Sequence, residues 1–275
     1  MAFYQLSFIK LMRFIFIGAI IILIIFFFFN DISNLNRQVN EVNLITTLPK
    51  DVGIKKIDVG QGEDIWILDD DGVLYHWSTI RKEIVTMAKS VTDFAVGMDG
   101  TVAVITSYKF LYIRNMNVLW QRLNEVRYDV YYSISICDSN TIFITTFNLD
   151  LIKGVYNSYT NTYNWEYVTS GGYRIFLQTS CASRDQSLWL LGPYSYISRY
   201  ISEHRQIVRS DMAFMQMKAL SEEYVIGVDY SNRLWVYSYG TWRLIRDGVK
   251  GATINYNGDI FFIDSDNFIF TIKEN

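Results

Sequence analysis

Residues 54–87 read IKKIDVGQGEDIWILDDDGVLYHWSTIRKEIVTM and divide into four short strands separated by turns. The first, Ile54 to Gly60, alternates apolar and polar residues, which is typical of a strand with one buried face. The second, Ile65 to Leu68, is wholly apolar and indicates a buried inner strand. Val73 to Trp77 and Glu83 to Met87 follow as the third and fourth. The stretch therefore predicts a four-stranded unit built from hairpins.

The same unit recurs along the chain. An apolar run follows a turn six times, and the second residues of these runs are Trp66, Ala103, Phe143, Trp189, Ile226 and Phe261. These positions are 37, 40, 46, 37 and 35 residues apart. A repeat of about 40 residues with several strands in each unit is typical of a β-propeller. The sequence therefore predicts an all-β fold with six blades.

The sixth unit stops after three strands. A strand-like segment, Asn43 to Leu48, lies before the first unit and has the pattern of a fourth strand. We expect it to pair beside Phe268 to Lys273 and close the ring, because closure hides a sheet edge that would otherwise be open. Residues 43–275 are thus predicted to form one closed six-bladed propeller.

The amino-acid composition and the absence of known catalytic motifs exclude several classes of function. Half of the 275 residues are hydrophobic, which excludes global disorder. With 25 Lys and Arg against 28 Asp and Glu, the chain is mildly acidic, which argues against nucleic acid as its ligand. Two cysteines exclude a multi-cysteine zinc module. No phosphate-binding loop, nucleophile elbow or zinc-protease motif is present, so we expect a protein that is not an enzyme and holds neither metal nor cofactor.

An uncharged run, Phe14 to Phe29, reads FIFIGAIIILIIFFFF and would span about 24 Å as a helix. It predicts a transmembrane helix after a short N-terminus (1–13) and before a polar stalk (30–42). Lys10 and Arg13 precede it, so the N-terminus is expected in the cytoplasm and the propeller on the lumenal or extracellular side, or on a virion membrane. A cleaved signal peptide is the alternative, but a small-residue cleavage site is missing.

Particular stretches resemble a known family. The first unit carries Ile57-Asp58-Val59-Gly60-Gln61-Gly62, Asp64-Ile65-Trp66-Ile67 and Gly72-Val73-Leu74-Tyr75-His76-Trp77, and the fifth carries Leu234-Trp235-Val236-Tyr237 and Gly240-Thr241-Trp242-Arg243. This pattern resembles the tectonin repeat. The resemblance implies a six-bladed propeller without enzymatic activity, in a family whose members include lectins for microbial or methylated sugars and protein-tethering modules.

Aromatic residues near the loops are the candidate ligand-binding residues, because sugars stack on aromatic rings while amides and carboxylates bind their hydroxyls. They are Trp77, Tyr163, Trp165, Tyr239 and Trp242. The alternative is that these rings seal the contacts between blades. Tyrosines and asparagines around Tyr163 resemble an adaptable recognition loop, although an ordinary long hairpin loop would read the same way.

Together these features predict a membrane-anchored, non-enzymatic recognition module that binds a glycan or a protein. One alternative is a structural or assembly protein of a viral or organellar membrane coat, and a third is a sialidase-like glycosidase. Cys137 and Cys181 end the first strands of neighbouring units and could face each other. A disulfide and two unpaired buried thiols both remain open, and the strict geometry of disulfides favours the thiols.

Overall fold

The computed structural model describes residues 42–273, apart from 49–51, 79–80, 116–118, 124–129, 149, 170–177, 193–195, 202–203 and 208–212. All of them belong to one compact unit, Val42–Asn275. Within this described part, no helix has the length and apolar character needed to cross a membrane. The transmembrane helix predicted at 14–29 lies outside the described residues and stays a prediction.

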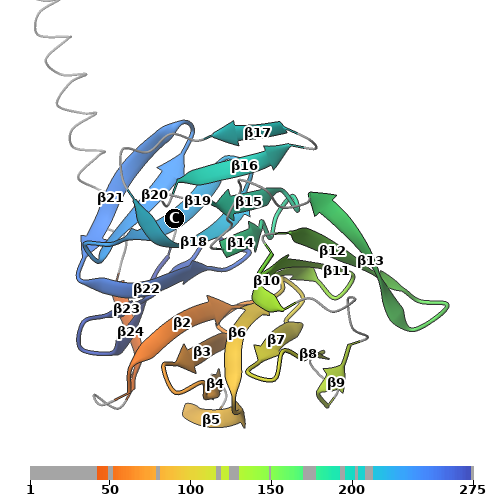
Figure 1. Cartoon of the computed structure of the whole chain (residues 1–275). Helices are drawn as coiled ribbons and strands as arrows, with labels where there is room; N and C mark the ends of the chain where they lie inside the picture. Colours follow the sequence, from red (N-terminus) through yellow and green to blue (C-terminus); the bar gives the residue numbers. More distant parts are fainter. Residues whose placement is uncertain are drawn as a thin grey trace, which may run out of the picture. The chain divides into compact units, whose positions relative to one another are not determined.

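Six four-stranded antiparallel sheets surround a central channel, with β2, β6, β10, β14, β18 and β22 innermost (Figure 1). The first three blades consist of β2 (Ile54–Val59), β3 (Ile65–Asp69), β4 (Leu74–Ser78) and β5 (Glu83–Ala88); β6 (Val91–Val96), β7 (Val102–Thr106), β8 (Leu111–Arg114) and β9 (Gln121–Arg122); and β10 (Tyr131–Asp138), β11 (Thr141–Thr146), β12 (Leu151–Asn157) and β13 (Thr162–Thr169).

The remaining blades consist of β14 (Gln178–Cys181), β15 (Leu188–Leu191), β16 (Ile197–Ile201) and β17 (His204–Ile207); β18 (Phe214–Ser221), β19 (Tyr224–Asp229), β20 (Arg233–Ser238) and β21 (Thr241–Asp247); and β22 (Val249–Ile254), β23 (Ile260–Asp264), β24 (Phe268–Ile272) and β1 (Val42–Thr47). The predicted six-bladed all-β fold is confirmed.

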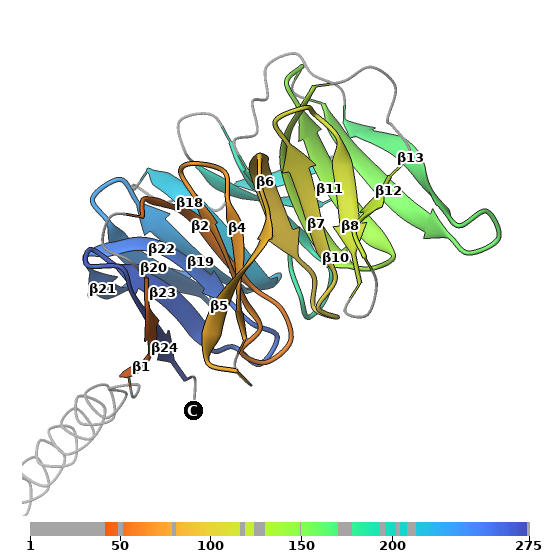
Figure 2. The same cartoon turned by 90° about the horizontal axis from the view of Figure 1, so that it is seen from below.

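The predicted closure is also confirmed. β1 pairs antiparallel with β24, and the register runs from Val42 opposite Ile272 to Thr47 opposite Phe268. The Leu48 amide extends the contact by donating to the Asn267 carbonyl at 3.0 Å. The first and last strands of the described unit thus complete one blade, and they lie side by side in Figure 2.

A repeated aspartate turn joins the second and third strands of three blades. Asp69, Asp229 and Asp264 each end a second strand, and their carboxylates accept the amide hydrogen of the residue four positions later. The residue three positions after each aspartate has a positive φ: Gly72 at 77°, Asn232 at 60° and Asn267 at 67°. Glycine and asparagine tolerate this left-handed conformation best, which explains the turn sequences.

Cys137 and Cys181 form a disulfide between β10 and β14, with their Cα atoms 5.1 Å apart. The interpretation as two unpaired thiols is therefore wrong. The physical reason is that the ends of these two inner strands face each other across the boundary between the third and fourth blades, within disulfide range. The bond ties the two blades together where both side chains are buried.

The third blade corrects a second expectation. Its tyrosine-rich segment is not a long loop, because β12 and β13 extend through it and pair Tyr156 with Tyr163 across the strands. Only residues 158–161 form the turn, and Tyr159 within it is almost fully exposed. This hairpin extends outward from the ring (Figures 1 and 2). Its aromatic rings are thus held on a regular sheet.

Candidate functional site

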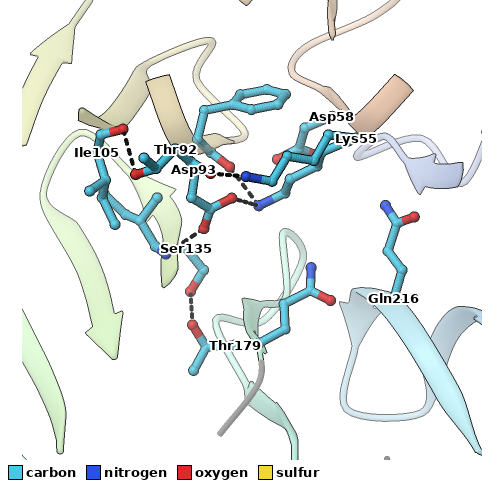
Figure 3. A network of polar contacts seen from close by, with 12 residues as sticks. Lys55, Asp58, Thr92, Asp93, Ile105, Ser135, Thr179 and Gln216 are labelled. Atoms are coloured by element: carbon cyan, nitrogen blue, oxygen red, sulfur yellow. Dashed lines mark hydrogen bonds and ion pairs between the residues drawn. The ribbon is translucent and has the colours of Figure 1, made fainter. Parts of the chain in front are cut away.

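The inner strands line the channel with polar side chains that bridge neighbouring blades (Figure 3). The Asp93 carboxylate of β6 accepts the Ile134 amide of β10 at 2.9 Å. The Gln178 amide oxygen of β14 accepts the Met217 amide of β18 at 3.0 Å. Gln216 of β18 donates to the Ala252 carbonyl of β22 at 3.1 Å. Strands β6, β14 and β18 thus each use a channel-facing side chain to bind the backbone of the next blade.

A buried ion pair crosses the channel deeper inside. Asp58 of β2 is 2% exposed and lies 2.7 Å from the Lys218 ammonium of β18. The same carboxylate accepts hydrogen bonds from the Thr253 hydroxyl and from the backbone amides of Val59 and Val96, at 2.9 to 3.0 Å. The free space at this level is only about 10 Å³. Asp58 and Lys218 therefore close the channel.

The channel is closed a second time at one of its ends. At this end lie the turns that connect the first and second strands of each blade. The Arg184 guanidinium, from the β14–β15 turn, donates to the carbonyls of Tyr256 and Asn257 in the β22–β23 turn at 3.1 and 2.9 Å. The Asn255 side chain links that turn to the Gly62 carbonyl of the first blade at 3.0 Å. At this end, three blades are joined directly across their turns.

The opposite end opens into a cavity of about 460 Å³, which we call the channel mouth. The residues that line it come from the beginnings of all six inner strands and from two outer turns: Lys55, Lys56, Thr92, Asp93, Lys109, Tyr131, Tyr132, Ser133, Phe147, Gln178, Met215, Gln216 and Lys250. Since the deeper channel is closed, the mouth is a pocket with one entrance. A site with contributions from every blade suits the binding of a ligand on the propeller axis.

Lysines dominate the charge of the channel mouth. Lys56 is neutralised by Asp93 at 2.7 Å, and Lys55 donates to the Thr92 carbonyl at 2.6 Å. Lys250 donates to the neutral side chain of Asn267 at 2.9 Å. Among the described residues, no carboxylate pairs with Lys55, Lys109 or Lys250. No described carboxylate thus neutralises these three lysines, on a chain whose net charge is −3.

A second cleft, of about 480 Å³, lies between the second and third blades, and we call it the tyrosine cleft. Its lining combines aromatic, amide and hydroxyl groups: Ile113, Asn115, Gln121, Arg122, Leu123, Ser139, Asn140, Tyr156, Asn161, Thr162 and Tyr163. The Tyr163 hydroxyl donates to the Ser139 carbonyl. Burial, and then the nearby Asp99 carboxylate, raises the pKa of Tyr163 well above its usual range, so the phenol stays neutral.

The five predicted ligand-binding residues lie in three different blades. Trp77 of the first blade is 7% exposed and packs in a core cluster. Tyr163 is 4% exposed and stacks near Trp165 in the third blade, with ring centroids 5.8 Å apart. Trp242 packs 4.7 Å from the Phe214 ring in the fifth blade, whereas Tyr239 is 85% exposed.

The structure therefore does not gather these five residues into one site. Tyr163 lines the tyrosine cleft, and Tyr239 lines a smaller cavity of about 190 Å³ beside the Arg199–Glu222 ion pair. The role of the five in binding stays a prediction. The channel mouth was not predicted, although the sequence held one signal: the first strand of each unit has a polar residue within its first three positions.

No group of three or more potential metal ligands occurs among the described residues. His76 of β4 contacts the Asp64 carboxylate and stacks on the Trp66 ring at 4.6 Å, so its described contacts are structural.

Comparison with known proteins identifies the fold and nothing finer. No family model matches the chain, and no curated protein matches it, so the tectonin resemblance is not confirmed. Similar solved structures include the WD40 repeats of RRP9, with a TM-score of 0.60, 11% identity, and coverage of 85% of this chain and 97% of that one. YCF48 bound to D1 peptide gives a TM-score of 0.56, 8% identity, and coverage of 86% and 97%.

The Cps50 (Swd1) β-propeller domain of Myceliophteria thermophila gives a TM-score of 0.58, 11% identity, and coverage of 85% of this chain and all of that one. At such low identity these similarities establish a WD40-like propeller fold. One of these three structures is described with a bound peptide.

Proposed function

We propose that this chain is a membrane-anchored, non-enzymatic recognition module that binds a segment of a partner protein at the channel mouth. The observation that carries the proposal is the shape of the channel: it is open at one end, with about 460 Å³ of free volume, and closed below by Asp58 and Lys218. A pocket of this size accepts a few side chains of an extended segment. The structure of YCF48 bound to D1 peptide is a precedent for peptide binding by a propeller of this fold, but it does not indicate which ligand this chain binds.

Placement of the propeller outside the cytoplasm is part of the proposal. The sequence supports it through the charges before residues 14–29. The disulfide between Cys137 and Cys181 supports it independently, because disulfides persist mainly in oxidising compartments. In sealed microsomes we expect the C-terminus to be protected from added protease while residues 1–30 are retained. Cleavage of the propeller from the cytoplasmic side would contradict this orientation.

Photo-crosslinking of the full chain tests the binding proposal. A photoreactive phenylalanine analogue replaces Tyr132, which is 48% exposed at the mouth, and in a matched control it replaces Leu244, which is 42% exposed on β21. We expect a discrete crosslinked protein from position 132 and not from position 244. Equal crosslinking at both positions, or at neither, would count against the channel mouth as the binding site.

Glycan binding is the second candidate function, and the tyrosine cleft is the observation that favours it. Asn115, Asn140 and Asn161 place amide groups beside the rings of Tyr156 and Tyr163, which is the mixture that sugar hydroxyls and apolar sugar faces require. A glycan array probed with the full chain tests this candidate. Signal that Asn140→Ala abolishes without lowering the melting temperature would establish it. A chain that binds no glycan but assembles into ordered lattices would instead favour the structural alternative.

A further inference from the structure

One hydroxyl beside the channel mouth is buried and has no hydrogen-bond partner in the part of the chain that the structure describes. Ser133 of β10 is 4% exposed and lines the mouth, yet no described donor or acceptor lies within hydrogen-bond distance of its Oγ atom. Buried hydroxyls usually have a partner, because desolvating one without a hydrogen bond destabilises the fold. Other inner-strand hydroxyls follow that rule: Thr179 donates to Ser135 at 3.1 Å, and Ser180 accepts from the Ala219 amide at 2.9 Å.

The charge around this hydroxyl is positive. Lys55, Lys109 and Lys250 are exposed, line the same cavity and have no carboxylate partner among the described residues. Among the described residues of the lining, Asp93 is the only carboxylate, and it is already paired with Lys56. Lysines gathered in a concave pocket focus a positive potential and attract an anionic group.

Apolar side chains line the channel mouth together with the lysines. Phe147 is 68% exposed and Tyr132 is 48% exposed, and Met215 lies partly buried in the same lining. Exposed rings of this kind are common where proteins bind other proteins. A small inorganic anion would use the lysines but would leave the rings and most of the 460 Å³ unfilled.

We infer that the ligand at the channel mouth is an acidic, extended segment of a partner protein. Its Asp or Glu carboxylates bind Lys55, Lys109 and Lys250, and a neighbouring apolar side chain contacts Phe147 and Met215. This inference rests on the proposed function, because it names the class of segment that the mouth accepts.

A random dodecapeptide display library tests the inference. It is selected against the full chain in nanodiscs of neutral phosphatidylcholine, so that anionic lipid does not compete. We expect Asp and Glu to be enriched in the selected pool relative to the input, and the enrichment to disappear against the double variant Lys55→Gln, Lys250→Gln. Selection against Lys82→Gln is the matched control, because Lys82 is an exposed lysine in the β4–β5 turn, away from the mouth. This control should retain the acidic enrichment.

The most enriched peptide is then measured by fluorescence anisotropy. Each of Lys55→Gln and Lys250→Gln should weaken binding by about two- to five-fold, as for single exposed ion pairs. Replacing the acidic residues of the peptide by their amides should weaken it more, and raising the salt concentration should weaken the wild-type complex.

Three results would overturn the inference. The first is a selected pool that is no more acidic than the input. The second is equal binding of the acidic peptide and its amide form. The third is displacement of the peptide by free phosphate or acetate at concentrations near that of the peptide, which would indicate a small-anion site. A neutral pool that still depends on residues of the mouth would refute only the acidic ligand and leave the proposed function standing. Failure of the crosslinking at Tyr132 would refute the proposed function itself.

Discussion

Substituting Asp58 is expected to produce the largest loss of stability of any single change in the channel. Its carboxylate is 2% exposed, pairs with Lys218 at 2.7 Å, and accepts hydrogen bonds from Thr253, Val59 and Val96. Asp58→Ala leaves the Lys218 ammonium in a closed space, where its other described contact is the Val96 carbonyl at 3.4 Å. It also leaves two buried amide hydrogens without that acceptor.

Removing one partner of a buried ion pair costs about 3–5 kcal/mol, because the other charge is left uncompensated. A domain of this size loses about 2–4 °C in melting temperature per kcal/mol. Asp58→Ala should therefore lower the melting temperature by about 6–20 °C. Asp58→Asn should cost less, because the amide oxygen still accepts hydrogen bonds from the backbone.

The assay is urea unfolding monitored by tryptophan fluorescence. The change in the free energy of unfolding is calculated from the shift in the urea midpoint, provided that the slope m is the same for the variant and the wild type. Lys218→Met and the double variant Asp58→Ala, Lys218→Met complete a double-mutant cycle. The double variant should be more stable than the sum of the two single losses predicts, because it leaves no unpaired charge in the channel. A loss below about 1 kcal/mol for Asp58→Ala, or additive losses in the cycle, would refute the role given to this pair.

Four further outcomes are expected. A chain beginning at Gly53 should melt well below one beginning at Asn40, because the edge of β24 is then unpaired; equal melting temperatures would contradict the closure by β1. Trp77→Ala should lower stability by about 3–5 kcal/mol in urea unfolding, since the ring is 7% exposed in a core cluster. Cys137→Ser with Cys181→Ser should cost about 2–4 kcal/mol by the same assay, and an unchanged urea midpoint would speak against a stabilising disulfide. Burial alone would raise the pKa of Asp229, but hydrogen bonds from Trp235, Arg233 and Ser231 hold it below its usual range. The stability that Asp229 contributes is therefore present at neutral pH and is lost as the pH falls through its folded pKa, so the difference in urea midpoint between wild type and Asp229→Asn should shrink from pH 7 to about pH 2.

The architecture could be predicted because its signals are local. The apolar run Ile65 to Leu68 and the turn ending at Gly72 report burial and backbone conformation within a few residues, and their repetition gives the number of blades. The closing strand could be predicted by counting strands, because the sixth unit has only three and an unassigned strand precedes the first unit. The same reasoning misjudged residues 156–163, because a turn rich in Asn and Tyr resembles a loop even when cross-strand pairs hold it as a hairpin.

The site could not be predicted to the same degree, because it depends on contacts between distant residues. Asp58 and Lys218 are 160 positions apart, and nothing in either neighbourhood points to the other. The lysines of the channel mouth come from different blades, and each reads as an ordinary surface residue on its own. Trp77 was selected because it lies near a loop, but the loop does not reveal that its ring packs inward at 7% exposure.

The closing strand also determines how the propeller would respond to a mechanical load. Val42 is paired with Ile272 at the end of the blade opposite the channel mouth, and Thr47 is paired with Phe268 at the mouth end. Tension applied at Val42 along the strand axis would load the whole β1–β24 ladder in shear, so its hydrogen bonds would have to break together. Tension applied outward from the ring would break them one pair at a time, starting at Val42. A polypeptide tether joined at this position would therefore hold the ring most firmly when the pull runs along the axis of β1.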